Sequence, residues 1–216
     1  MKSFVQFILL SVALLLSEGL QAQAALVALI FGDKVASEKF NISMEVGANF
    51  AHLSNTNKIA RYRGDLNFGI GANYMLSEHW FLSPTVYFIS KRTLELSEMT
   101  PGTTDQILNL KFANSDASLT ANYVDVPVMI YREFGKRKFR LGLGPQVSFL
   151  KNAEAIYEGT TSNLKVDYTS NVTGIDYGFL SSFGYSLGEA RKGKGLFLQV
   201  RYYQGFTDVS TAITGN

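Results

Sequence analysis

Residues 123–150 read YVDVPVMIYREFGKRKFRLGLGPQVSFL and alternate apolar and polar positions on both sides of a short break at Gly135-Lys136-Arg137. In the first arm, one face is wholly aliphatic and carries Val124, Val126, Val128 and Ile130. Alternation with a period of two is typical of a β-strand, because successive side chains point to opposite sides of the pleat. Two such arms around a tight polar break predict an antiparallel hairpin.

The opposite face of this hairpin mixes polar, small and aromatic residues. It carries Tyr123, Asp125, Pro127, Met129 and Tyr131, followed by Arg140, Gly142, Gly144, Gln146 and Ser148. A soluble sandwich buries its apolar face, whereas a transmembrane barrel turns that face to lipid and keeps polar groups inside. The aliphatic face is therefore expected to contact lipid, and the mixed face to line a lumen.

The same alternation recurs along most of the chain. Besides the hairpin, it predicts strands at 40–50, 65–76, 80–91, 174–187 and 195–205. Each is close to the roughly 9–11 residues that a tilted strand needs to cross the hydrocarbon. The fold class predicted is all-β, an antiparallel up-and-down transmembrane β-barrel of about eight strands, of which seven are readable in this sequence.

The connections between these strands alternate in length. Residues 51–64, 92–122 and 151–173 form long connections, and 77–79, 135–137 and 188–194 form shorter ones. Membrane barrels have short periplasmic turns and long extracellular loops. The first strand is therefore expected to rise from a periplasmic N-terminus, with the long loops facing the medium.

Composition agrees with this class and excludes others. Aromatic residues make up 13% of the chain, which suits the aromatic girdles of a barrel but also a large β-sandwich. The net charge of +2 is too small to indicate a nucleic-acid partner. With no cysteine there is no disulfide, thiolate metal site or lipoprotein anchor, and no motif calls for a cofactor.

Residues 1–24 are predicted to be a signal peptide. Lys2 supplies the positive start, 4–16 form a short apolar core, and 17–24 (SEGLQAQA) offer cleavage after Ala22 or Ala24. The alternative is an uncleaved anchor, but the apolar run is short for a membrane span, which takes about 20 residues. With the barrel pattern, this predicts location in the cell outer membrane.

The barrel domain is predicted to be 40–216, after a short helical or irregular periplasmic lead-in at 25–39. Leu26, Leu29 and Ile30 have helical spacing there. Single-chain bacterial barrels have even strand numbers, so an eighth, descending strand is expected. A last strand missing from the sequence, closure by 25–36, a partner's strand, or direct pairing of the first and seventh strands are the open alternatives.

The stretches ALIFGDKVASEKF, NYVDVPVMIYREF and FRLGLGPQVSFL resemble the PorT-like small outer-membrane β-barrels of Bacteroidota. The most specific parts are the Tyr-x-Asp-x-Pro strand at 123–127 and the Gly-Pro pair at 144–145. The resemblance implies an outer-membrane barrel of about eight strands. It also implies a link to protein secretion, the role of the member that names the family, although most members have no assigned activity.

Charged residues fall on the predicted lumen face of several strands. They are Glu45, Asp65, Lys91, Asp125, Glu133, Arg140, Asp176 and Arg201. Buried charges need partners or water, so we expect a lumen ion network. The first interpretation is structural, because the interior of an eight-stranded barrel is just filled by side chains. The alternative is an ion path through a narrow porin.

The strongest catalytic candidate is the pair His52 and Ser54, within His52-Leu53-Ser54-Asn55. On one strand face, such a pair could supply a general base beside a nucleophile. The stretch resembles the His-x-Ser-Asn motif of outer-membrane lipid A deacylases. No orienting carboxylate is identifiable, so a polar loop entrance is the favoured interpretation and an esterase the alternative.

The sequence therefore predicts a non-enzymatic outer-membrane barrel with a structural, secretion-associated or surface-interaction role. Expected partners are outer-membrane lipid and envelope or secretion-machinery proteins. The long connections 92–122 and 151–173 are the expected contact surfaces, because loops commonly hold binding residues.

Overall fold

The computed structural model describes residues 37, 39–52, 59–135, 138–189 and 194–208. Almost all of them belong to one antiparallel sheet. In chain order the elements are β1 (Phe40–Phe50), β2 (Ile59–Tyr62), β3 (Gly64–Ser77), β4 (Trp80–Met99), α2 (Gln106–Lys111), β5 (Ser115–Phe134), β6 (Phe139–Tyr157), β7 (Leu164–Asp167), the 3-10 turn η2 (Thr169–Asn171), β8 (Ile175–Glu189) and β9 (Lys194–Gly205).

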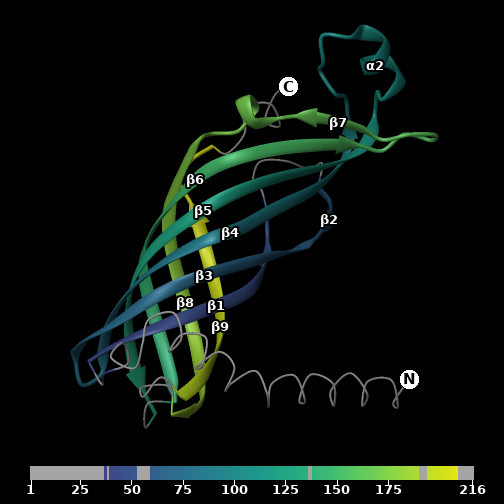
Figure 1. The fold of residues 1–216 in the computed structure, drawn as a ribbon. Coiled ribbons are helices and arrows are strands. Elements are labelled where there is room, and N and C mark those ends of the chain that lie inside the picture. The colour runs from purple at the N-terminus through teal and green to yellow at the C-terminus, as the bar shows by residue number, and fades with distance from the viewer. Residues whose placement is uncertain (1–36, 38, 53–58, 136–137, 190–193, 209–216) are drawn as a thin grey trace, which may run out of the picture.

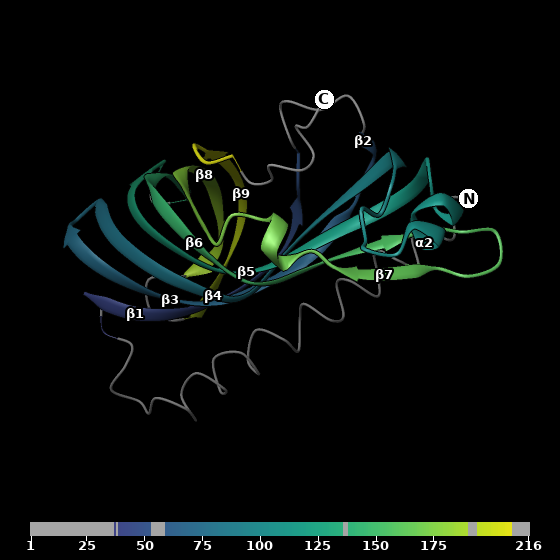
Figure 2. The ribbon, with the colours of Figure 1, turned by 90° about the horizontal axis from the view of Figure 1, so that it is seen from above.

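Seven long strands run side by side in the order β1-β3-β4-β5-β6-β8-β9, and every neighbouring pair is antiparallel. Seen from above, this sheet curls into part of a barrel, with β1 and β9 at its two ends (Figure 2). The short strands add to its outer part, since β2 pairs with β4 and β7 pairs with β6. The all-β antiparallel fold is confirmed.

The two faces of the sheet have the polarity expected from the sequence. On the convex face, Val128, Ile130, Leu141 and Leu143 are exposed. On the concave face, Asp125, Met129, Tyr131 and Arg140 are buried. The predicted central hairpin is confirmed, and its arms pair from Phe134 and Phe139 outward. Apolar side chains face away from the lumen because lipid, rather than a second layer, covers them.

The short connections gather at one end of the sheet (Figure 1). Glu78 and His79 alone separate β3 from β4, and the backbone N–H of Glu133 donates to the carbonyl of His79. Gly135 begins the β5–β6 turn with a φ of +61°, a conformation that favours glycine. Because membrane barrels have short periplasmic turns, we expect this end to face the periplasm.

The long connections were predicted wrongly in part. Of residues 92–122, 92–99 belong to β4 and 115–122 to β5, so the loop is reduced to 100–114 with α2 inside it. Likewise β6 continues to Tyr157, and β7 and η2 lie within 151–173, while β2 lies within 51–64. In β4, a register shift between Tyr87 and Ser90 interrupts the alternation where the predicted strand was ended, and a second shift, between Asn122 and Tyr123, interrupts the pairing of β5 with β6.

Beyond the membrane-sized part, β4, β5 and β6 continue as a separate module (Figure 1). We call it the outer module and define it by the apolar cluster Leu94, Leu96, Phe112, Ala117, Leu119, Ala121, Tyr123, Ala153, Ala155, Tyr157, Tyr168 and Val172. These side chains pack together on the concave face, where the lower part of the sheet is polar. The polarity of that face therefore reverses along the same strands, from a polar lumen to a water-excluding core.

Helix α2 lies at the tip of the outer module (Figure 1). The carboxylate of Asp105 accepts hydrogen bonds from the backbone N–H groups of Ile107 and Leu108, at 2.8 and 3.3 Å, and so caps the helix. Leu108 and Phe112 anchor this loop on the core. In the described part of the chain, no helix is long and apolar enough to cross a membrane.

Residues 1–36 lie outside the described residues. The predicted signal peptide at 1–24 and nearly all of the lead-in at 25–39 are therefore not tested by the structure.

The face assignment predicts a position-dependent cost of an added charge. Val128→Arg places a guanidinium against lipid near the middle of the β5 span and should destabilise the barrel by about 2–4 kcal/mol. Asp116→Arg is the matched control, because Asp116 is exposed on the same strand in the outer module. Unfolding by urea in lipid vesicles measures both variants. Equal destabilisation by the two arginines would show that Val128 does not face lipid.

Candidate functional site

Arg92 enters the lumen because of the irregularity in β4. Phe88 and Ile89 are both exposed at the register shift, so Ser90 and Arg92, rather than Lys91, continue the lumen face. Lys91 pairs with Asn122 and lies on the opposite face. The prediction that Lys91 faces the lumen is wrong, since one extra residue in a strand reverses the face of every residue after it.

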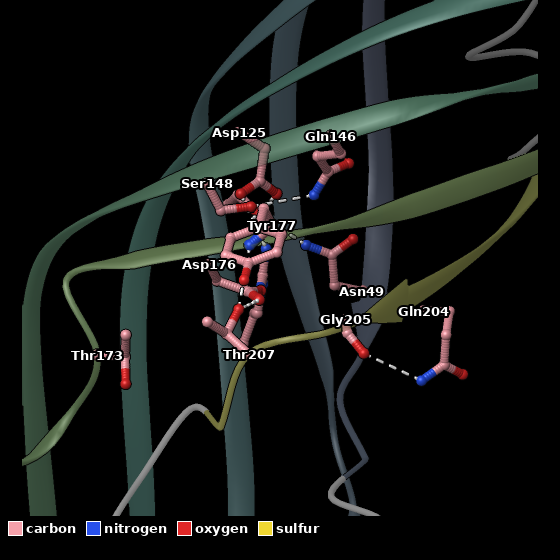
Figure 3. Close-up of polar contacts among 12 residues, drawn as sticks. Asn49, Asp125, Gln146, Ser148, Thr173, Asp176, Tyr177, Gln204, Gly205 and Thr207 are labelled. Atoms are coloured by element: carbon pink, nitrogen blue, oxygen red, sulfur yellow. Dashed lines mark hydrogen bonds and ion pairs between the residues drawn. The ribbon is translucent and has the colours of Figure 1, made fainter.

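The guanidinium of Arg92 lies between two carboxylates. Its Nη2 is 2.9 Å from Asp125 Oδ1, and its Nη1 is 2.8 Å from Asp176 Oδ2. Nη2 also donates to the Ser148 hydroxyl at 2.9 Å. Asp176 and Ser148 are 1% and 0% exposed, so this centre is removed from solvent. Figure 3 shows Asp125, Ser148 and Asp176 converging from three strands.

The remaining oxygens of both carboxylates have partners as well. The Ser90 hydroxyl donates to Asp125 Oδ2 at 2.5 Å, and the Thr207 hydroxyl donates to Asp176 Oδ1 at 2.5 Å (Figure 3 shows Thr207 beside Asp176). The Arg92 guanidinium also lies over the Tyr123 ring, 4.3 Å from its centroid. A buried ion cluster is stable only when its lone pairs and protons are satisfied in this way.

A second ion pair joins the two ends of the curled sheet. Arg201 on β9 donates through Nη2 to Glu45 Oε2 on β1, and the Tyr87 hydroxyl donates to the same oxygen. The strands β1 and β9 are not hydrogen-bonded neighbours in the sheet. This contact therefore links the sheet ends through their side chains.

A third pair lies nearer the periplasmic turns. Arg140 Nη2 is 3.4 Å from Glu133 Oε1, and these residues also pair across β5 and β6. The guanidinium is enclosed by aromatic rings, at 4.3 Å from the centroid of Phe197 and 4.7 Å from that of Tyr131. Such contacts attract a cation to the negative face of a ring.

The lumen charges predicted from the sequence thus separate into groups. Asp125 and Arg140 lie on the two arms of one hairpin but do not pair, because Asp125 is opposite Ser148 while Arg140 is opposite Glu133, farther along the strands. Asp65 is buried and accepts from the backbone N–H of Thr93 at 2.6 Å. Arg92, the centre of the largest group, was missed, and only the bulge in β4 distinguishes it from Lys91.

Tyrosine rings fill the space between the ion pairs. Tyr131 on β5 lies against Gly142 on β6, and Tyr87 on β4 lies against Gly69 on β3. A Cβ atom on either glycine would collide with the facing ring. At these positions the lumen glycines make room for bulky neighbours.

The structure gives the catalytic candidates little support. Strand β1 ends at Phe50, so His52 does not belong to that strand and cannot share a face of it with Ser54. His52 is exposed, and its Nδ1 lies 3.3 Å from the Tyr62 hydroxyl. Ser54 lies outside the described residues. Among the described residues, no cluster of three or more His, Asp or Glu side chains could hold a metal ion.

Tyr157 and Asp167, which lie beyond the membrane-sized part of the sheet, have shifted pKa values. Burial in the apolar cluster raises the pKa of Tyr157 to about 12, because it disfavours the phenolate. Hydrogen bonds from Thr169 hold the pKa of Asp167 below its ordinary value, since they stabilise the carboxylate. Neither shift brings a group near neutrality, so neither group is suited to acid–base catalysis.

A comparison with known protein families agrees with the curled sheet and its polar lumen. Residues 21–211 match the model of the outer membrane protein beta-barrel domain. The chain belongs to this family. No curated protein matches the chain. Membership and fold place this outer membrane protein beta-barrel domain in the outer membrane. The family match does not extend to the more specific PorT-like identity.

The lumen of the domain is suited to holding strands together. Arg92 alone joins side chains of β5, β6 and β8, and Asp176 extends the group to Thr207 beyond β9. Such a network constrains the relative heights of β4, β5, β6 and β8, because each of these strands contributes at least one partner.

The Arg92 cluster predicts that substitutions of the adjacent residues Arg92 and Lys91 differ strongly in their effect on stability. Arg92→Met leaves Asp125 and Asp176 without their cation and should destabilise the barrel by about 3–5 kcal/mol. Lys91→Met, the matched neighbour on the other face, should change stability by less than about 0.5 kcal/mol. Unfolding in lipid vesicles measures both. Adding Asp125→Asn and Asp176→Asn to Arg92→Met should restore part of the loss; a purely additive triple variant would contradict the cluster.

Proposed function

We propose that this outer-membrane barrel is a non-enzymatic surface protein that presents its outer module to another envelope protein. Secretion-associated assembly is one setting for such contact. The membrane part then serves as an anchor, and the outer module provides the surface that contacts the other protein.

The observation that carries the proposal is the length and packing of β4, β5 and β6. These strands have 20, 20 and 19 residues, about twice what a tilted strand needs to cross hydrocarbon. Their outer halves are packed by the apolar cluster and supported at their edges by β2 and β7. A structural anchor alone has no use for a rigid projection with its own core.

The tip of the outer module offers an apolar contact. Ile107 and Leu110, three residues apart on α2, are 77% and 79% exposed. Residues with this spacing lie on one side of a helix. Exposed apolar side chains on a rigid support are typical of protein–protein contact sites.

The lumen supports an anchoring rather than a transporting role. Its guanidinium groups at Arg92, Arg140 and Arg201 each have a carboxylate partner. Paired and sterically enclosed charges attract permeating ions less than free ones do. No observation favours the esterase. His52 lies within hydrogen-bond distance of the Tyr62 hydroxyl, and Ser54 lies outside the described residues.

The test is crosslinking in intact cells through α2. We expect wild-type protein to give a discrete crosslinked species with an envelope protein identifiable by mass spectrometry. The double variant Ile107→Ser, Leu110→Ser should lose it, because the apolar contact is removed. The matched control Ile107→Leu, Leu110→Met keeps the apolar surface and should retain the species.

Outer-membrane fractionation of each variant shows that the barrel assembles. If all assembled variants give the same crosslinked species, or if none does, α2 is not a contact site and the proposed function is wrong.

A further inference from the structure

An arginine lies on the lipid-facing side of the sheet, near the end where the short connections gather. The convex face of β5 carries Val128, Ile130, Arg132 and Phe134 in succession toward the turn, and all four are exposed. Lipid covers apolar side chains on this face of a membrane barrel. A guanidinium group placed there is costly unless it reaches the membrane boundary or an anion.

The side chains around Arg132 supply no counter-charge. Its cross-strand neighbours are Trp80 on β4 and Leu141 on β6. The guanidinium carbon of Arg132 lies 5.6 Å from the centroid of the Trp80 ring. Among the described residues, no carboxylate forms an ion pair with Arg132, and Glu78 in the adjoining turn has an interaction of its own. The described part of the chain therefore gives this cation an aromatic ring but no anion.

Aromatic rings form a band at the same end of the sheet, on β5, β6 and β8. The rings of Phe134 and Phe139 stack with their centroids 5.9 Å apart. Phe139 also contacts Phe183, at 6.0 Å between centroids, and Tyr185, at 5.3 Å. Such aromatic girdles lie at the boundary between hydrocarbon and lipid head groups. Phe134 lies beyond Arg132 toward the turn, so the long arginine side chain can extend to this boundary.

We propose that Arg132 and Trp80 bind the phosphate group of an anionic phospholipid in the leaflet at the short-turn end of the barrel. A planar guanidinium can donate two parallel N–H groups to phosphate oxygens. The Trp80 ring orients the guanidinium, and an indole of this kind is suited to the head-group region. Lys138, exposed in the β5–β6 turn, adds a second positive charge near the boundary. Two cations favour a head group with net negative charge over a zwitterionic one.

The surroundings of Arg132 favour a lipid over a soluble anion. Ile130 and Leu141 are exposed beside it and offer apolar surface to acyl chains, while the aromatic band marks the level of the head groups. A phospholipid satisfies both regions with one molecule. Val128 lies on the same face but four residues farther from the turn, about 13 Å at the usual rise of a strand. A cation at that depth has no phosphate within reach, which distinguishes Arg132 from a charge placed at midspan.

This site is independent of the proposed contact with an envelope protein. Helix α2 lies at the opposite end of the sheet from the short connections (Figure 1). Loss of one interaction therefore leaves the other in place.

Fluorescence of Trp80 tests the proposal, because it is the single tryptophan of the chain and lies beside Arg132. The folded full-length protein is placed in phosphatidylcholine vesicles that contain a small, equal fraction of either brominated phosphatidylglycerol or brominated phosphatidylcholine. Bromine quenches tryptophan fluorescence at close contact, so the ratio of the two quenching efficiencies measures which lipid occupies the site. We expect the anionic lipid to be enriched beside Trp80 by about fivefold, the usual effect of one basic side chain at an anionic lipid surface.

Variants assign this preference to the guanidinium. Arg132→Gln should reduce the enrichment to nearly equal quenching by the two lipids, whereas Arg132→Lys keeps the cation and should retain most of it. Lys111→Gln is the matched control, because it removes the same charge from the last turn of α2 and should retain the full preference. The ratio is taken within each variant, so a change in the intrinsic brightness of Trp80 cancels. Wild-type protein alone already tests the preference, whether or not a variant folds.

The proposal is supported by enrichment in the wild type and in Lys111→Gln that is lost in Arg132→Gln. Equal quenching by the two lipids in the wild type overturns it. Enrichment that persists in folded Arg132→Gln, or that falls equally in Lys111→Gln, also overturns it, because net charge rather than this site would then attract the lipid. Loss of the preference on adding inorganic phosphate at constant ionic strength would assign the site to a soluble anion and would likewise overturn it.

Discussion

The structure depends on one guanidinium group held between two carboxylates inside a membrane protein. Arg92, Asp125 and Asp176 come from β4, β5 and β8, and the guanidinium nitrogens lie 2.9 and 2.8 Å from the carboxylate oxygens of Asp125 and Asp176. An unpaired charge at this depth is costly, so the three strands can assemble stably only at the heights where the groups meet. Glu45 and Arg201 impose the same requirement on β1 and β9.

The medium that contacts the convex face explains why the concave face is polar in one part of the sheet and apolar in another. In the membrane part, lipid covers Val128 and Leu141, and the concave face is polar. In the outer module, water lies outside, and the concave face is built from residues such as Leu96 and Ala117. The strands continue from the membrane part into the outer module, and the register shift after Tyr87 lies near the point where the concave face changes from polar to apolar. The result is a membrane-sized curled sheet that continues into a part with its own apolar core.

Much of the membrane part could be predicted from alternation alone. The strand at 40–50 and the antiparallel hairpin of residues 123–150 were predicted because lipid-facing and lumen-facing residues alternate strictly there. The extensions to Met99 and Tyr157 could not be, because a bulge interrupts the period. The same bulge places Arg92 on the lumen face instead of Lys91. The sequence therefore predicted Asp125 and Asp176 as lumen residues but not the ion cluster that they form with Arg92.

The central claim is that paired charges and tyrosine rings fill the lumen and hold the strands together. Electrical recording from the folded protein in planar bilayers tests it most directly. The account predicts no stable single-channel steps from the wild-type barrel. Reproducible steps whose conductance or ion selectivity changes in Arg140→Ala or Arg201→Glu would contradict it and would make the lumen an ion path.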